Sequence, residues 1–216
     1  MKANIRYSFL ACVLLGLVLA VLGWRLVPTT SLVSIAGVCF ILVAYGLAGL
    51  LGFPRLRPEN LRLAGQFGLL AAAIFATEIL LEYVLLPGDN SNWGLIEYAL
   101  VFAVIFGAGV MQAYRSRRIR SGILASVVSG MLASVIWLIF VLLTFYIFRG
   151  SARQTLVFTA EGNYADFASS GMQDFNAFIM EDFFGGGFFH LVLVPLLAGI
   201  LGTLAGLVGK GLAYKK

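Results

Sequence analysis

Charged residues are scarce in this 216-residue chain: Asp, Glu, Lys and Arg together make up 12% of it, whereas 61% of its residues are hydrophobic. A typical soluble domain carries about twice that charged fraction. The mean hydropathy of +0.97 points the same way. The composition therefore excludes a soluble domain and predicts a protein whose apolar surface faces lipid.

Histidine and cysteine, on which many metal sites and catalytic centres depend, are nearly absent. The chain has one histidine, His190, and two cysteines, Cys12 and Cys39. One histidine cannot form an H-E-x-x-H zinc motif and leaves little for a Ser/His or Cys/His catalytic pair. The cysteines fall at different depths of two apolar stretches, so we expect neither a disulfide nor a shared metal. Since Walker and dinucleotide-binding glycine patterns are missing too, an enzyme is the least favoured class.

Apolar stretches occupy most of the chain. A membrane span needs about 20 mostly apolar residues to cross about 30 Å of hydrocarbon. Six stretches meet this requirement: 7–27, 31–53, 64–86, 93–114, 121–148 and 187–209. They leave room for one domain over residues 1–216. The sequence therefore predicts an all-α integral membrane protein with six transmembrane helices in one bundle.

The charges separate by side once these spans are drawn. Basic residues gather at the ends and loops of one side: Lys2, Arg6, Arg55, Arg57, Arg62, Arg115, Arg117, Arg118, Arg120, Lys210, Lys215 and Lys216. All acidic residues except Glu59 lie at or just below the other side. Because Lys and Arg are enriched in cytoplasmic loops, we expect both termini in the cytoplasm.

The basic loops also predict what surrounds the protein. They lie beside apolar spans rather than on a soluble surface, so a nucleic-acid partner is not expected. The run Arg115–Arg120 holds four arginines in six positions and suits the headgroups of anionic lipids. We therefore expect a multi-pass protein of a cell membrane, in a bacterial plasma membrane.

Ionisable residues inside the predicted spans are the candidates for function. Glu78 and Glu82 are four residues apart and therefore share one face of the third helix. Glu97 on the fourth helix and His190 on the last are expected at a similar depth to Glu82. These four residues are predicted to form a ligand- or ion-binding group on the outer side of the membrane.

Two interpretations of this group remain open. Carboxylates at this depth are costly unless they are paired, protonated or metal-bound, which favours a proton or a cation. Glu82, Glu97 and His190 are weak metal candidates, and a divalent cation is the cofactor they would hold. Alternatively, these side chains extend to the interface or pair with Arg25 or Arg149.

The sizeable segment between the last two spans, 149–186, has no span of its own. Thr155–Thr159 alternates weakly and is typical of a strand, whereas Asp166–Phe184 has the apolar periodicity of a helix. The segment is therefore predicted to contain an amphipathic helix on the outer interface. It would act either as a lid over the outer mouth or as an anchor without a gating role.

Glycine and proline suggest where the last helix moves and packs. A hinge is predicted at Gly185, Gly186, Gly187 and Pro195, and a static kink is the alternative for the proline. Gly202 and Gly206 continue a stripe of small residues from Ala198 and are predicted packing positions. The stripe would contact either this bundle or another subunit, as a membrane partner or a second copy.

Three functions follow from these features. The leading hypothesis is a small transporter or uptake subunit that binds a cationic or proton-coupled ligand at the acidic group. The alternative is a non-catalytic accessory or assembly subunit of a larger membrane complex. The third, a metal-dependent enzyme within the membrane, lacks catalytic residues.

Overall fold

The computed structural model describes residues 5–81, 83 and 91–214, without the side chains of 91–93. Every regular element in these residues is helical. The helices are α1 (Ile5–Leu26), α2 (Leu32–Leu47), η1 (Ala48–Gly52), η2 (Phe53–Arg55), α3 (Pro58–Leu80), α4 (Ser91–Ser116), α5 (Ile119–Phe148), α6 (Ala152–Ala160), α7 (Asn163–Ser170) and α8 (Phe175–Ala213). Within the described part of the chain, six helices are long and apolar enough to span a membrane, α2 together with η1 and η2 forming one of them.

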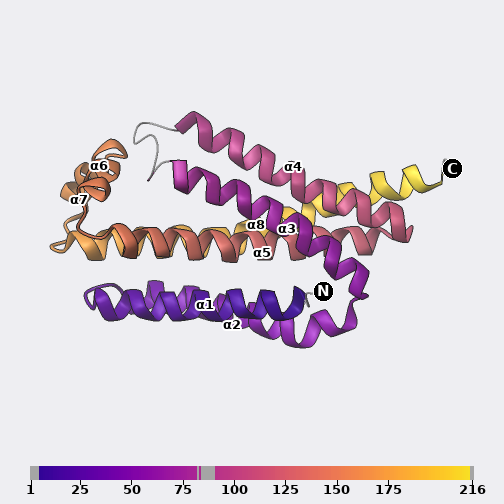
Figure 1. Ribbon diagram of the computed structural model, residues 1–216, viewed down its shortest axis with the longest axis horizontal. Helices are drawn as coiled ribbons and strands as arrows, with labels where there is room; N and C mark the ends of the chain where they lie inside the picture. The colour runs from indigo at the N-terminus through magenta and orange to yellow at the C-terminus, as the bar shows by residue number, and fades with distance from the viewer. Residues whose placement is uncertain (1–4, 82, 84–90, 215–216) are drawn as a thin grey trace.

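The long helices form a bundle around a central antiparallel pair, α5 and α8 (Figure 1). The α1–α2 pair packs on one side of this centre and the α3–α4 pair on the other. The short helices α6 and α7 lie at one end, which we call the α6–α7 end. The opposite end carries the C-terminus and the short α4–α5 connection.

Small residues allow the close approach of α5 and α8. A Cβ atom at Gly202 would lie 3.0 Å from the Cα atom of Ile123, and one at Gly206 would lie 2.8 Å from a side-chain carbon of Ile119. Helices in lipid associate through such close contacts rather than through a hydrophobic force. Glycine at these positions therefore sets the distance between the two central helices.

The last helix begins earlier than the sequence predicts. It starts at Phe175 rather than near residue 187, and Asp174 caps it by accepting hydrogen bonds from the backbone N–H groups of Asn176 (2.9 Å) and Ala177 (3.4 Å). Its first turns pack against α5, where the rings of Phe145 and Phe183 are 5.9 Å apart. This packing outweighs the low helix propensity of the glycines that follow.

The α1–α2 connection ties down the start of α8. The Thr29 hydroxyl donates to Oδ2 of Asp174 at 2.6 Å, and the backbone N–H of Ser31 donates to Oε1 of Glu181 at 3.0 Å. Glu181 therefore has a structural partner at the α6–α7 end.

The segment between α5 and α8 also differs from its predicted structure. The strand expected at Thr155–Thr159 is wrong, because these residues lie in α6, which Ser151 caps by accepting from the N–H of Gln154 at 3.2 Å. The helix expected over Asp166–Phe184 is interrupted, because Gly171 has a φ of +75° after the end of α7. Left-handed backbone of this kind favours glycine and ends the helix.

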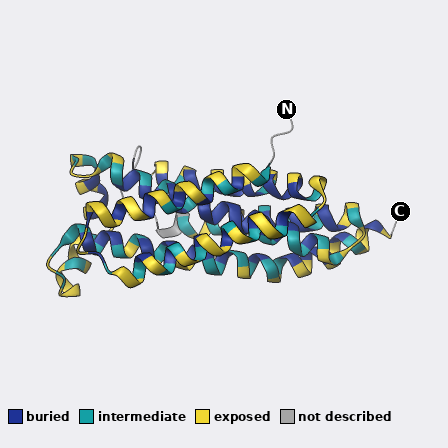
Figure 2. Ribbon diagram, turned by 90° about the horizontal axis from the view of Figure 1, so that it is seen from below, coloured by how far each residue is buried: buried dark blue, intermediate teal, exposed yellow. Residues whose placement is uncertain are grey.

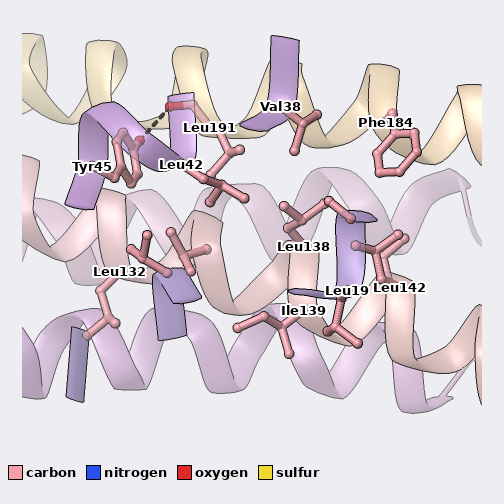
Figure 3. Close-up of a cluster of buried hydrophobic side chains, with 14 of the residues drawn as sticks. Leu19, Val38, Leu42, Tyr45, Leu132, Leu138, Ile139, Leu142, Phe184 and Leu191 are labelled. Carbon is pink, nitrogen blue, oxygen red and sulfur yellow. Dashed lines mark hydrogen bonds between the residues drawn. The ribbon is translucent and has the colours of Figure 1, made fainter. Parts of the chain in front are cut away.

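Apolar side chains fill the centre and also cover the outside of the bundle. Figure 2 shows buried faces turned inward and exposed faces turned outward along the long helices. The core includes Leu42, Leu138 and Leu191, beside which the Tyr45 hydroxyl donates to the Leu191 carbonyl oxygen at 2.5 Å (Figure 3). Large apolar residues such as Phe40 and Ile200 are exposed, as expected for a surface in contact with lipid.

Candidate functional site

Four helices contribute an aromatic ring to one cluster around His190. Its imidazole stacks on the indole of Trp137 from α5, with ring centres 3.7 Å apart and an angle of 11°. The rings of Phe75 from α3 and Tyr98 from α4 both lie 5.8 Å from it. His190 is only 7% exposed, so this cluster joins α3, α4, α5 and α8 inside the bundle.

Hydrogen bonds fix the imidazole of His190 in one tautomer. Its Nδ1 lies 2.8 Å from the carbonyl oxygen of Gly186, which can only accept, so Nδ1 carries the hydrogen. In the neutral ring Nε2 is then an acceptor, and the Tyr98 hydroxyl donates to it at 2.5 Å. On protonation, Nε2 would become a donor and Tyr98 would have to accept. The two hydrogen bonds therefore match the neutral imidazole.

A cavity of about 250 Å³ opens beside this cluster. Three carboxylates line it: Glu78 from α3, Glu161 at the end of α6, and Asp182 from α8. His190, Thr144 and the rings of Tyr83, Trp137 and Phe183 are also in the lining. The cavity thus combines negative charge, aromatic surface and one imidazole between helices that could span a membrane.

Helical spacing explains why these side chains meet. Asp182, Gly186 and His190 follow one another at four-residue intervals and therefore lie on one face of α8. The glycine between them lies beside the indole, because a Cβ atom at Gly186 would make an ordinary van der Waals contact with Trp137 at 3.5 Å. This face of α8 therefore contributes the Asp182 carboxylate and the His190 imidazole to the same cavity.

The structure brings together two of the four residues predicted as the binding group. Glu78 and His190 line the same cavity and are close enough to interact electrostatically. The Glu78 carboxylate also faces α4, since a Cβ atom at Gly94 would lie 3.6 Å from its Oε1. Glu97 is 6% exposed and interacts with Tyr98, but it is not one of the residues that line the cavity. Glu82 lies outside the described residues.

Two lining carboxylates were not predicted as site residues. Both belong to the segment 149–186, which the sequence predicts on the outer side, and Asp182 lies in the amphipathic helix predicted over Asp166–Phe184, before the last span. The four-residue spacing of Asp182, Gly186 and His190 is the pattern that would have revealed Asp182. No comparable pattern in the sequence points to Glu161, whose position depends on how α6 folds back.

The described residues offer little support for a metal centre. Among them, no three His, Cys, Asp or Glu residues are grouped closely enough to hold a metal ion. The weak candidates Glu97 and His190 therefore lack a third described ligand. Cys12 and Cys39 are free thiols on α1 and α2.

The predicted hinge residues lie within an unbroken helix. Gly185, Gly186, Gly187 and Pro195 all belong to α8. A Cβ atom at Gly187 would lie 2.7 Å from Cδ1 of Leu138, whereas one at Gly185 would have no described neighbour within 4 Å. Gly187 is therefore required for close packing against Leu138. Gly185 makes no such close contact with the described residues.

The small-residue stripe of α8 faces this bundle. Ala198, Gly202 and Gly206 are buried, and both glycines lie against α5. The stripe is therefore covered within the chain, as the first of the two predicted contacts requires.

In comparisons with known proteins, no family model, no curated protein and no solved structure matches this chain. The cavity is the feature that brings ionisable side chains together. Glu161 and Asp182 are exposed and Glu78 is half-buried, and all three line this one space. Together they favour a positive charge between them, and a neighbouring imidazole can gain or lose a proton.

Proposed function

We propose that this protein is a small membrane transporter, or an uptake subunit, that binds a cationic or proton-coupled ligand in the acidic cavity. The observation that carries the proposal is the convergence of Glu78, Glu161, Asp182 and His190 on one cavity inside a bundle of apolar helices. Acidic residues within membrane-spanning helices, such as Glu78 and Asp182, are costly and mark ion and substrate pathways in membrane proteins. A cation or a proton would offset that cost.

The distribution of charge supports an orientation for the cavity. The arginines of Arg115–Arg120 are exposed on the α4–α5 connection, at the end opposite α6 and α7. Cytoplasmic loops of membrane proteins are enriched in Lys and Arg. In the proposed orientation, both termini therefore lie in the cytoplasm and the α6–α7 end faces outward. Glu161 lines the cavity from the end of α6, which supports a covering role for the α6–α7 segment. The ligand would then enter from the outer side of a bacterial plasma membrane.

The same arginines would bind the headgroups of anionic lipids. Arg115, Arg117, Arg118 and Arg120 are all exposed. Clustered basic side chains beside a membrane are attracted to its negative surface potential. This contact would keep the cytoplasmic end of the bundle at the level of the lipid headgroups.

His190 and Tyr98 support coupling to protons. A proton on His190 would place a positive charge near Glu78, whose carboxylate would attract it. That charge would partly neutralise the carboxylates and weaken their attraction for a ligand cation. Protonation would therefore favour release, and deprotonation would favour binding.

The test uses Glu78→Gln and Asp182→Asn, with Glu59→Gln as control because Glu59 is exposed at the other end of α3. Purified proteins are compared for thermal stabilisation by sodium, calcium, manganese and tetraethylammonium chlorides, and for flux of these ions and of protons in proteoliposomes. We expect the wild type and the control to respond and both cavity variants to lose at least tenfold in apparent affinity or flux. If the cavity variants match the wild type in every assay, the proposal is rejected.

A further inference from the structure

We infer that the ligand of the cavity is an organic ammonium ion, such as a protonated amine or a quaternary ammonium, rather than a bare metal ion. This inference rests on the proposed function and specifies its substrate class. Three features of the cavity carry it: its size, the separation of its carboxylates and its aromatic surface.

The size of the cavity suits a small organic molecule. Its volume of about 250 Å³ approaches that of typical ligand pockets, about 300–1,000 Å³. A water molecule occupies about 30 Å³ in the liquid, so the space exceeds the needs of a single dehydrated ion. A bare cation binds tightly only where oxygen ligands close around it at about 2.0–2.6 Å.

The carboxylates are spread around the cavity rather than gathered at one point. Glu78 lies in α3, Glu161 caps the C-terminal end of α6 and Asp182 lies in α8, and the three line one space. No three potential ligand residues among those described are close enough to share a metal ion. Such an arrangement surrounds a large, diffuse positive charge with negative charge from several directions. An ammonium ion with carbon substituents has this shape.

Aromatic side chains supply the remaining wall. Trp137, Tyr83 and Phe183 line the cavity together with the carboxylates. The face of an aromatic ring attracts ammonium ions, tryptophan most strongly, and such rings also contact the carbon substituents. The stacking of His190 on one face of Trp137 fixes the orientation of the indole that lines the cavity. A hydrated inorganic ion would gain little from these three rings.

The test measures binding of tetraethylammonium chloride and manganese chloride by isothermal titration calorimetry. The proteins are the full-length wild type, Glu78→Gln, Trp137→Phe, Phe183→Leu and the control Glu59→Gln. We expect saturable binding of tetraethylammonium, weakened at least tenfold by E78Q and at least threefold by W137F or F183L, and unchanged by E59Q. Gel filtration checks the fold, and F183L provides the aromatic test if W137F does not fold.

Different results would overturn different claims. If manganese binds in an E78Q-sensitive manner and tetraethylammonium does not, the substrate class is wrong while a cation site remains. If tetraethylammonium binds with equal affinity to the wild type, W137F and F183L, the aromatic wall has no part and the inference fails. If neither ion binds and proton flux is absent, the proposed function fails with it.

Discussion

The Tyr98 hydroxyl lies 2.5 Å from Nε2 of His190 and thereby joins α4 to α8 inside the bundle. The other ring nitrogen is bonded to the Gly186 carbonyl oxygen, so both nitrogens have partners. Replacing Tyr98 with Phe would leave Nε2 without this donor in a buried position. Leaving such a group unsatisfied costs about 1–3 kcal/mol.

Tyr98→Phe is therefore expected to lower the free energy of unfolding by about 1–3 kcal/mol. Thermal unfolding of the purified protein in detergent measures the change. Tyr214→Phe is the matched control, because Tyr214 is exposed at the end of α8 and its hydroxyl is not needed for packing. Equal stability of the two variants would show that the Tyr98–His190 hydrogen bond contributes nothing measurable.

Gly209→Ala tests the close contact between α8 and α4. A Cβ atom at Gly209 would collide with the Val110 carbonyl oxygen and lie 2.9 Å from Cβ of Ala113. Overpacking of this kind costs about 1–3 kcal/mol. Gly211→Ala is the control, because an added Cβ meets no described atom within 4 Å and alanine is a better helix former by up to about 1 kcal/mol.

We expect Gly209→Ala to lower the unfolding midpoint and Gly211→Ala to maintain or raise it. Both are measured by thermal unfolding under the same detergent conditions. A stable Gly209→Ala protein would mean that α4 and α8 can separate at this point without loss.

Asp174 makes the stability of the α6–α7 end depend on pH. The hydrogen bond from Thr29, followed by those from the N–H groups of Ala177 and Asn176 and by the charge of Arg149, lowers the pKa of Asp174 from its ordinary value of 3.8. A lowered pKa means that the ionised cap stabilises the folded protein fully above the unfolded value and loses this effect as pH falls through the folded one. Asp174→Ala should cost about 1 kcal/mol at neutral pH.

The measurement is the difference in unfolding midpoint between wild type and Asp174→Ala as a function of pH. This difference should be constant near neutral pH and shrink below pH 3.8. Thr29→Val removes the largest cause of the lowered pKa, so in that background the difference should shrink at a higher pH. Asp166→Asn is the control for general carboxylate titration. A difference that does not change with pH would contradict the role of Asp174 as a charged cap.

Gly185→Ala tests the predicted hinge in α8. The residue lies in a continuous helix with no described atom within 4 Å of an added Cβ, so alanine should stabilise the helix by up to about 1 kcal/mol. We expect higher thermal stability with unchanged ligand affinity. A loss of flux with unchanged affinity would show that transport requires bending at this glycine. Gly187→Ala, which would contact Leu138, is the comparison for a packing defect.

Local sequence patterns predicted which ionisable residues lie inside the apolar stretches, but not which of them meet. The expected depths placed His190 level with Glu82 and Glu97 and placed Glu78 deeper, whereas Glu78 and His190 line one cavity. Asp182 was not predicted as a site residue, because the helix expected over Asp166–Phe184 was placed on the outer interface and separate from the last span. Its place in α8 depends on the Asp174 cap and on packing against α5, neither of which a local pattern contains.

The sequence by itself determined the class of this protein, because a chain with 61% hydrophobic and 12% charged residues cannot cover itself with polar surface and must place its long apolar helices in lipid. Only the tertiary structure decided which faces meet. It turned the stripe of Gly202 and Gly206 toward α5 and set Trp137 against His190. It also brought Glu161 to the cavity. Such contacts join residues far apart in the chain, and they depend on the register of α5 against α8, which helix periodicity does not fix.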